Sequence, residues 1–220
     1  MTACPRIDRD PPDPTHPGLD ALAVRGVRRG LAADADACWQ LVNFSGRFAE
    51  ISSSHSSASL TLVFRLVHQA QKQDEPVAWI SDRESTFFPP DVAAAGVDLE
   101  TLAVIRAPGL LEAARAADQL MRSGAFGLLV MDIGPNPRMP LHAQTRLVGL
   151  AKKHATALLC ITEKMSHRPS IGSLVSLRAE ALRTQKIGCR FQCELRVLKD
   201  KRRGPGWTHR EVCRGPDGLC

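Results

Sequence analysis

Between residues 46 and 164, hydrophobic residues alternate between short continuous runs and stretches with helical spacing. The short runs predict buried strands, and these strands are expected over residues 47–51, 76–81, 102–106, 126–133 and 155–162. Between several of the strands, hydrophobic residues recur every three or four positions, which predicts helices over residues 60–70, 111–121 and 140–154. Buried strands that alternate with helices of this length predict an α/β domain with a mostly parallel sheet.

Local signals refine this pattern. In the first strand, the apolar Phe48 and Ile51 stand on either side of the charged Glu50. Gly124, after the second helix, predicts a helix end with a left-handed cap. The prolines and glycine of residues 89–96 predict a loop.

The period of the pattern changes to two after Lys164. Residues 175–181 and 187–197 alternate between apolar and polar side chains, which predicts two half-buried strands, partly antiparallel to the rest of the sheet. A further strand is expected around residues 207–212. The predicted fold is therefore a mostly parallel sheet flanked by helices, with late strands of mixed direction.

The two ends of the chain differ from its centre. Residues 2–18 contain five prolines among charged side chains, a composition that favours disorder. Residues 19–41 have only weak helical spacing, and residues 199–220 are basic. We therefore predict a disordered arm over 1–18, one α/β domain over 19–198, and a basic extension over 199–220.

Composition restricts the classes of function. The chain has 220 residues, a formal net charge of +6, 5% aromatic residues and no tyrosine, so a platform that stacks nucleic-acid bases is not expected. No apolar run approaches the ~20 residues of a membrane helix, and residues 1–17 carry no secretory signal. A cytoplasmic location is expected, in which the seven cysteines would be free thiols.

The loop before the first helix has the place of a phosphate-binding P-loop but not its residues. A P-loop needs two glycines, a lysine and a Ser or Thr magnesium ligand at fixed spacing. The corresponding positions here carry Ser53, Ala58, Ser59 and Leu60. Asp132 ends a buried strand where a magnesium ligand would lie, and without the lysine a structural role is favoured. No catalytic residue, cofactor or metal is expected.

Several segments resemble the RecA family. Residues 46–62 are similar to the strand, loop and helix around its P-loop, and residues 79–81 to its next core strand. Residues 122–132, 147–163 and 195–201 are similar to later elements, so the resemblance covers about four-fifths of the chain. It implies a RecA-like core.

The chain also departs from that family at its functional positions. The carboxylate that activates water is matched by Arg83, with Glu84 one place away, and the nucleotide-sensing glutamine by Glu163. Residues 132–141 are too short for the first DNA-binding loop, and residues 164–173 retain only a remnant of the second. The resemblance therefore implies a scaffold without ATP turnover or filament-type DNA binding.

This combination resembles the ImuA family, the RecA-like proteins of damage-inducible mutagenesis cassettes. The resemblance implies a non-catalytic adaptor in SOS-induced translesion DNA synthesis. Its partners would be RecA and ImuB, and an error-prone DnaE-type polymerase would be reached through ImuB, with weak or no direct DNA binding. The alternative is a SulA-like cell-division inhibitor that binds FtsZ.

The basic end of the chain is the expected partner surface, because Arg and Trp often anchor protein interfaces. The residues assigned to it are Lys199, Lys201, Arg202, Arg203, Trp207 and Arg210. A zinc site at Cys189, Cys193, His209 and Cys213 is disfavoured, since the first two cysteines share the apolar phase of a strand and the spacing lacks a CxxC pair.

Overall fold

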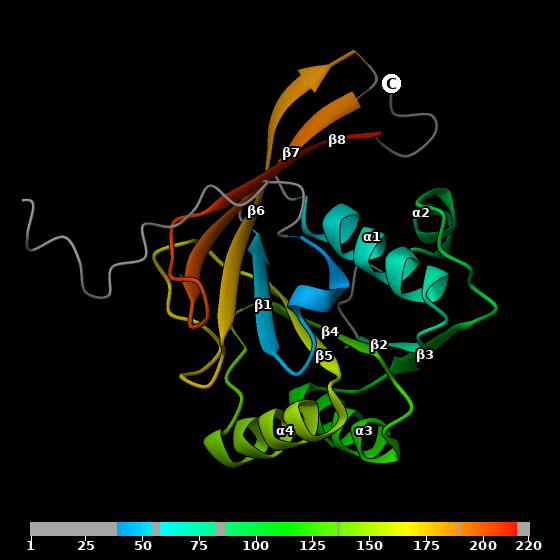
Figure 1. The fold of residues 1–220 in the computed structure, drawn as a ribbon, viewed down its shortest axis with the longest axis vertical. Coiled ribbons are helices and arrows are strands. Elements are labelled where there is room, and N and C mark those ends of the chain that lie inside the picture. The colour runs from blue at the N-terminus through cyan, green and yellow to red at the C-terminus, as the bar shows by residue number, and fades with distance from the viewer. Residues whose placement is uncertain (1–38, 54–57, 82–86, 136, 189, 215–220) are drawn as a thin grey trace, which may run out of the picture. The chain divides into compact units, whose positions relative to one another are not determined.

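The computed structural model describes residues 39–53, 58–81, 87–135, 137–188 and 190–214 (Figure 1). Within them, eight strands form one sheet in the order β3-β2-β4-β5-β1-β6-β7-β8. The predicted arm over residues 1–18 and the weakly helical stretch up to residue 38 lie outside the described residues.

The first part of the sheet is parallel. Its strands are β1 (Phe48–Ser53), β2 (Val77–Ser81), β3 (Leu102–Arg106), β4 (Leu128–Pro135) and β5 (Ala157–Glu163). The strands β1, β2, β4 and β5 are almost continuously buried. Because both faces of these strands are covered, they need long apolar runs, and this is the pattern that predicted them.

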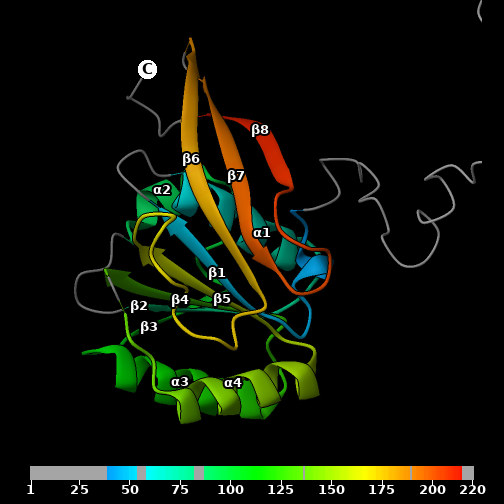
Figure 2. The same ribbon diagram turned by 90° about the vertical axis from the view of Figure 1, so that its left-hand side faces the viewer.

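The second part of the sheet is antiparallel. β6 (Leu177–Ile187) pairs in parallel with β1, whereas β7 (Arg190–Asp200) and β8 (Thr208–Arg214) each run antiparallel to the strand before them. Figure 2 shows these long strands extending beyond the parallel strands. Residues 199–214, assigned from sequence to an extension, thus complete β7, a turn and the edge strand β8.

Helices cover the two faces of the parallel strands (Figure 2). α1 (Ser59–Lys72), α2 (Pro89–Ala94) and the short 3-10 helix η3 (Leu41–Asn43) contribute to one hydrophobic core. α3 (Leu110–Ser123) and α4 (Leu141–His154) pack on the opposite face and form the second core. The mostly parallel α/β fold expected from sequence is confirmed.

Two local predictions were wrong. Residues 89–94 form α2 rather than a loop, because the prolines occupy its first turn, where a missing backbone N–H costs little. Ile187 ends β6 rather than starting β7, and the hairpin turns at Gly188, whose positive φ of 59° suits glycine. The predicted left-handed cap at Gly124 is confirmed, with φ at 69°.

Among the residues that the structure describes, no helix is long and apolar enough to span a membrane.

Candidate functional site

The carboxyl ends of β1, β4 and β5 meet at one edge of the sheet, where a parallel α/β domain usually binds ligands. Ser53 lies beside Glu163 in the register, and Asp132 lies between Ser81 and Ile161. Asp132 is buried, with 5% of its surface exposed, whereas Glu163 is exposed. Arg83 and Glu84 lie outside the described residues.

The P-loop positions that are described are filled by small or apolar side chains. Ala58 and Ser59 are buried at the start of α1, and Leu60 packs against the hydrophobic core. The first turn of α1 has neither an acidic residue nor a side-chain cap. Where a P-loop places a long cationic side chain there is a buried serine, so this position supplies no side-chain charge to neutralise a phosphate.

A buried ionic cluster lies beneath this edge. The carboxylate of Glu50 on β1 is fully buried and pairs with the ammonium of Lys164. Thr162 Oγ1 and the backbone N–H of Ile171 donate hydrogen bonds to the two Glu50 oxygens, at 3.0 and 2.9 Å. Arg178 Nε on β6 lies 4.0 Å from Glu50 Oε1. The carboxylate is therefore well satisfied inside the protein.

The same cations hold the remnant loop over residues 164–173. Lys164 Nζ donates a hydrogen bond to the Pro169 carbonyl at 2.8 Å. The Arg178 guanidinium donates to the carbonyls of Met165 and Arg168. Because these polar groups are paired within the domain, the loop is a closed structural connection between β5 and β6.

A second buried carboxylate organises the turn between β7 and β8. Asp200 accepts hydrogen bonds from the Arg47 guanidinium at 2.6 Å and the Trp207 indole at 3.2 Å. It also accepts one from the Arg202 backbone N–H at 2.8 Å. Burial alone would raise the pKa of Asp200, but the donors, led by the Arg202 backbone N–H, hold it below its ordinary value. The turn is thus built on an ionised carboxylate.

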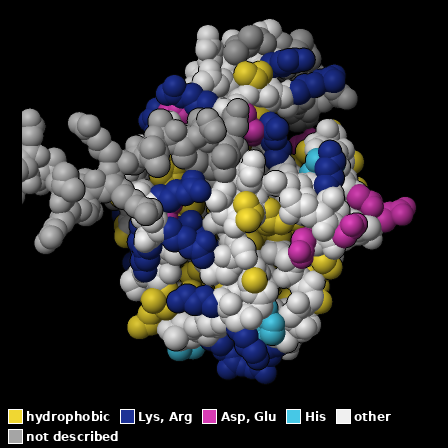
Figure 3. All heavy atoms as spheres, viewed as in Figure 1, with side chains coloured by type: hydrophobic (Ala, Val, Ile, Leu, Met, Phe, Trp, Pro, Cys, Tyr) yellow, Lys and Arg dark blue, Asp and Glu magenta, His cyan; other side chains and the backbone are white. Residues whose placement is uncertain are grey.

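Three cationic side chains are exposed on this turn. Lys201 Nζ donates to the Ser173 carbonyl at 2.9 Å, and Arg202 donates to the Ser45 carbonyl at 3.2 Å. Arg203 donates to Asn43 Oδ1 at 3.0 Å. These contacts orient the side chains, and all three residues remain exposed. Figure 3 shows Lys and Arg side chains gathered on the left of the view, where this turn lies in Figure 1.

The remaining members of the expected partner surface separate into two places. Lys199 and Trp207 are half-buried beside the turn, and Lys199 Nζ donates to the Ser173 carbonyl at 3.3 Å. Arg210 lies further along β8, where it pairs with Glu194 at 2.9 Å. Arg196 pairs with the same carboxylate at 2.6 Å, and these partners lower the pKa of Glu194. The structure therefore groups five of the six residues and places Arg210 apart.

Cys193 is buried, as its apolar phase in the strand pattern indicated. Cys193 and Cys213 are buried on adjacent strands, and Cys160 is buried within β5. Cys189 lies outside the described residues, and among those that are described no three His, Cys, Asp or Glu side chains are grouped to hold a metal ion.

The sequence analysis did not identify the buried charged residues that hold the loop over 164–173 and the basic turn over 201–203 in place. Glu50, Arg47 and Asp200 are charged side chains within or beside apolar strand segments and are almost fully buried. Their position in the sequence could have identified them. A charged residue within a strand that is buried on both faces needs a partner of opposite charge.

Comparison with known proteins agrees with this architecture. The family model described as the RecA N-terminal domain matches residues 41–161. Protein RecA of Fusobacterium nucleatum subsp. nucleatum is 39% identical over 87 residues, which cover 40% of this chain and 23% of that protein. Protein RecA of Rhodospirillum rubrum is 29% identical over 166 residues, covering 66% of this chain and 41% of the relative. The chain spans less than half the length of these curated relatives.

A solved structure shares the fold. The crystal structure of the RadB recombinase superimposes with a TM-score of 0.58 at 16% identity, covering 76% of this chain and 86% of that chain. The RecA-like α/β fold implied by the sequence resemblance is thereby confirmed. Since the family match extends over more than half of the chain, this protein belongs to the RecA N-terminal domain family.

Proposed function

We propose that this protein is a non-catalytic RecA-like adaptor of the ImuA type, which links RecA to ImuB during error-prone DNA repair after damage. An error-prone DnaE-type polymerase would join through ImuB. In this proposal the protein binds other proteins through its surface and does not hydrolyse ATP.

One observation carries the proposal. In this RecA-like domain, the P-loop positions that would bind phosphate and magnesium carry uncharged residues packed into the protein. Ser59 stands at the lysine position and is 3% exposed, and Leu60 packs into the core. A helix start of this kind lacks the charge that neutralises a triphosphate. The domain keeps its RecA-like fold without the residues that bind ATP, which suits a protein whose role is to bind other proteins.

The closed loop over residues 164–173 supports the absence of filament-type DNA binding. Lys164 at its start is directed inward to Glu50 and the Pro169 carbonyl. Arg178 on β6 holds the Met165 carbonyl, so that only Arg168 presents an exposed Lys or Arg side chain within the loop. Phosphate contacts dominate the affinity of proteins for DNA, so Lys and Arg side chains committed to the interior contribute little.

The basic turn over residues 201–203 is the proposed partner surface. Its side chains are exposed, and Asp200 fixes the backbone that carries them. A surface that is already ordered loses less conformational entropy on binding. Together with the half-buried Trp207, the turn offers the Arg and Trp side chains that anchor many interfaces.

The test is label-free binding of the purified chain to RecA, ImuB and FtsZ, measured side by side at physiological salt. A variant with Lys201, Arg202 and Arg203 changed to Ala should bind RecA or ImuB at least ten-fold more weakly. The matched control changes Lys72, Lys152 and Lys153 to Ala, which removes the same charge from exposed helix positions. The control should bind within two-fold of the unmodified chain.

Other outcomes would redirect the proposal. Binding to FtsZ alone would identify a division inhibitor instead. Equal losses in both triple variants would mean that net charge, and not this turn, governs binding. If magnesium and millimolar ATP raised the melting temperature, the proposed loss of nucleotide binding would be contradicted, because a ligand of the native state stabilises it.

A further inference from the structure

Two cysteines on the antiparallel strands lie within reach of each other. Cys193 on β7 and Cys213 on β8 are 3.0 Å apart between their sulfur atoms, with the Cys193 thiol donating to Cys213. A covalent S–S bond measures about 2.05 Å, so a shift of about 1 Å would join them. Both side chains are buried, with 0% and 4% of their surfaces exposed. Neither sulfur takes part in the ionic clusters around Glu50 or Asp200.

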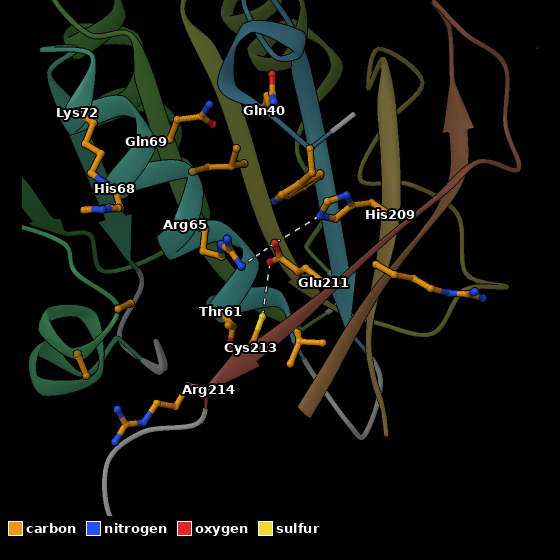
Figure 4. Close-up of a pocket in the computed structure, with 16 residues that line it drawn as sticks. Gln40, Thr61, Arg65, His68, Gln69, Lys72, His209, Glu211, Cys213 and Arg214 are labelled. Atoms are coloured by element: carbon orange, nitrogen blue, oxygen red, sulfur yellow. Dashed lines mark hydrogen bonds and ion pairs between the residues drawn. The ribbon is translucent and has the colours of Figure 1, made fainter. Parts of the chain in front are cut away.

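Cys213 lies in the wall of a groove, although only 4% of its surface is exposed. Cys213 lines a cavity of about 940 Å³ between α1 and β8. Figure 4 shows Arg65 from α1 directed toward Glu211 of β8, with Arg65 Nη1 2.7 Å from Glu211 Oε2. The Cys213 sulfur lies 3.6 Å from the other oxygen of the same carboxylate. Lys72 and Arg214 also line the groove. Cys193 does not line it, so an incoming reagent meets Cys213 first.

The surroundings of Cys213 favour its thiolate. The hydrogen bond from Cys193 and the nearby Arg65 lower the pKa of Cys213, against the opposing effects of burial and of Glu211. The pKa of Cys193 is raised, first by its hydrogen bond to Cys213 and then by burial. A reactive cysteine needs an electropositive and partly accessible environment, and a neighbouring thiol can complete the reaction.

We propose that Cys213 and Cys193 form a two-cysteine redox site that takes hydroperoxides, with Cys213 as the nucleophile and Cys193 as the resolving thiol. The Cys213 thiol releases its proton to solvent and its sulfur bonds to one peroxide oxygen. The O–O bond breaks, and the departing alkoxide or hydroxide takes up a proton from solvent in place of the one released. The Cys193 sulfur then bonds to Cys213, and its proton leaves with the displaced hydroxide as water. Two thiols lose two electrons in total, and the peroxide is reduced to an alcohol and water, or to two waters. The disulfide joins the edge strand β8 to β7.

The experiment treats the reduced full-length chain with hydrogen peroxide and maps it without reduction after tryptic digestion. Trypsin places Cys193 on the peptide 191–196 and Cys213 on the peptide 211–214, each with no other cysteine. The expected product is these two peptides joined, two hydrogens lighter than their sum. It should form at least ten-fold faster in the folded chain than in urea, because only the fold holds the sulfurs together.

Variants then separate the two roles. Cys193→Ser should leave Cys213 as a sulfenic acid that dimedone traps, whereas Cys213→Ser should leave Cys193 unmodified. The matched control is Cys160→Ser, because Cys160 is equally buried and distant in sequence, and the joined peptides should form as before. Circular dichroism and thermal melting check that each variant is folded.

The proposal fails if the folded chain without substitutions gives no joined peptides, or forms them no faster than the unfolded chain. That measurement needs no variant, so a misfolded substitution cannot obscure it. If dimedone instead labels Cys193 in the Cys213→Ser variant, the assignment of nucleophile and resolving thiol is overturned.

Discussion

The buried carboxylate of Glu50 gives a sharp test of how the domain is held together. The substitution Glu50→Gln keeps the size of the side chain and removes its charge. Glu50 is fully buried, and the side chains of its partners Lys164 and Arg178 are 5% and 6% exposed. After the substitution, two cations remain in the interior without their common anion.

The structure sets the size of the expected loss. Removing one member of a buried ion pair costs about 3–5 kcal/mol. Lys164 keeps its hydrogen bond to the Pro169 carbonyl, and Arg178 keeps those to the loop carbonyls. Because these bonds remain, we expect the free energy of unfolding to fall by about 3 kcal/mol, the lower end of that range. For a domain of this size the melting temperature would fall by roughly 6–12 °C.

Urea unfolding followed by circular dichroism measures this loss, and hydrogen exchange over residues 164–173 shows whether the loop opens. The matched control is Glu112→Gln, since Glu112 and Arg115 form an exposed pair 3.8 Å apart. It should cost less than about 1 kcal/mol. Adding Lys164→Met to Glu50→Gln should recover part of the stability, because it removes one unpaired charge. A loss below about 1 kcal/mol for Glu50→Gln would refute the reasoning.

Three further predictions concern stability alone. The pKa of Asp200 is lowered in the folded protein, so its carboxylate stabilises the fold at pH values above about 4, its pKa in the unfolded chain. This contribution is lost as the pH falls below that value, and acid unfolding should show the loss. The substitution Asp200→Asn should make the stability depend less on pH in this range. Gly124→Ala should destabilise by about 1–2 kcal/mol, since φ is 69° and the new Cβ would lie 2.7 Å from His154 Nδ1. Gly149→Ala, in an exposed helical position with no atom within 4 Å of the new Cβ, should instead stabilise by about 0.5–1 kcal/mol in urea titrations; equal effects at the two glycines would contradict both arguments.

The fold could be predicted because its main signals are local. Continuous apolar runs identified the parallel strands, and helical spacing identified α1, α3 and α4. The sequence pattern did not show that Glu50 is buried, because its burial follows from the place of β1 between β5 and β6, where the strand is buried along its whole length. Alternation predicts an exposed face only where one face of the sheet meets water.

The supporting contacts of the candidate sites depend on residues far apart in sequence. Arg47 and Asp200 meet across 153 positions, and Glu50 meets the Ile171 backbone across 121. Composition marked residues 199–210 as basic, but only the sheet register shows that Arg210 shares Glu194 with Arg196 and lies apart from the turn. Pairing of this kind follows from topology, which a single sequence does not give directly.

Asp200 also separates two explanations of how the basic turn would bind a partner. If only charge mattered, Asp200→Asn would strengthen binding to an acidic protein, because it raises the net positive charge by one and leaves Lys201, Arg202 and Arg203 in place. If the arrangement matters, the substitution loosens the turn, because Arg47, Trp207 and the Arg202 backbone N–H all donate to that carboxylate. We expect weaker binding by about five- to ten-fold, with the salt dependence of the affinity unchanged, since the exposed charges are the same. Binding to RecA or ImuB that stayed equal or grew tighter would show that the partner recognises charge without the geometry that Asp200 imposes.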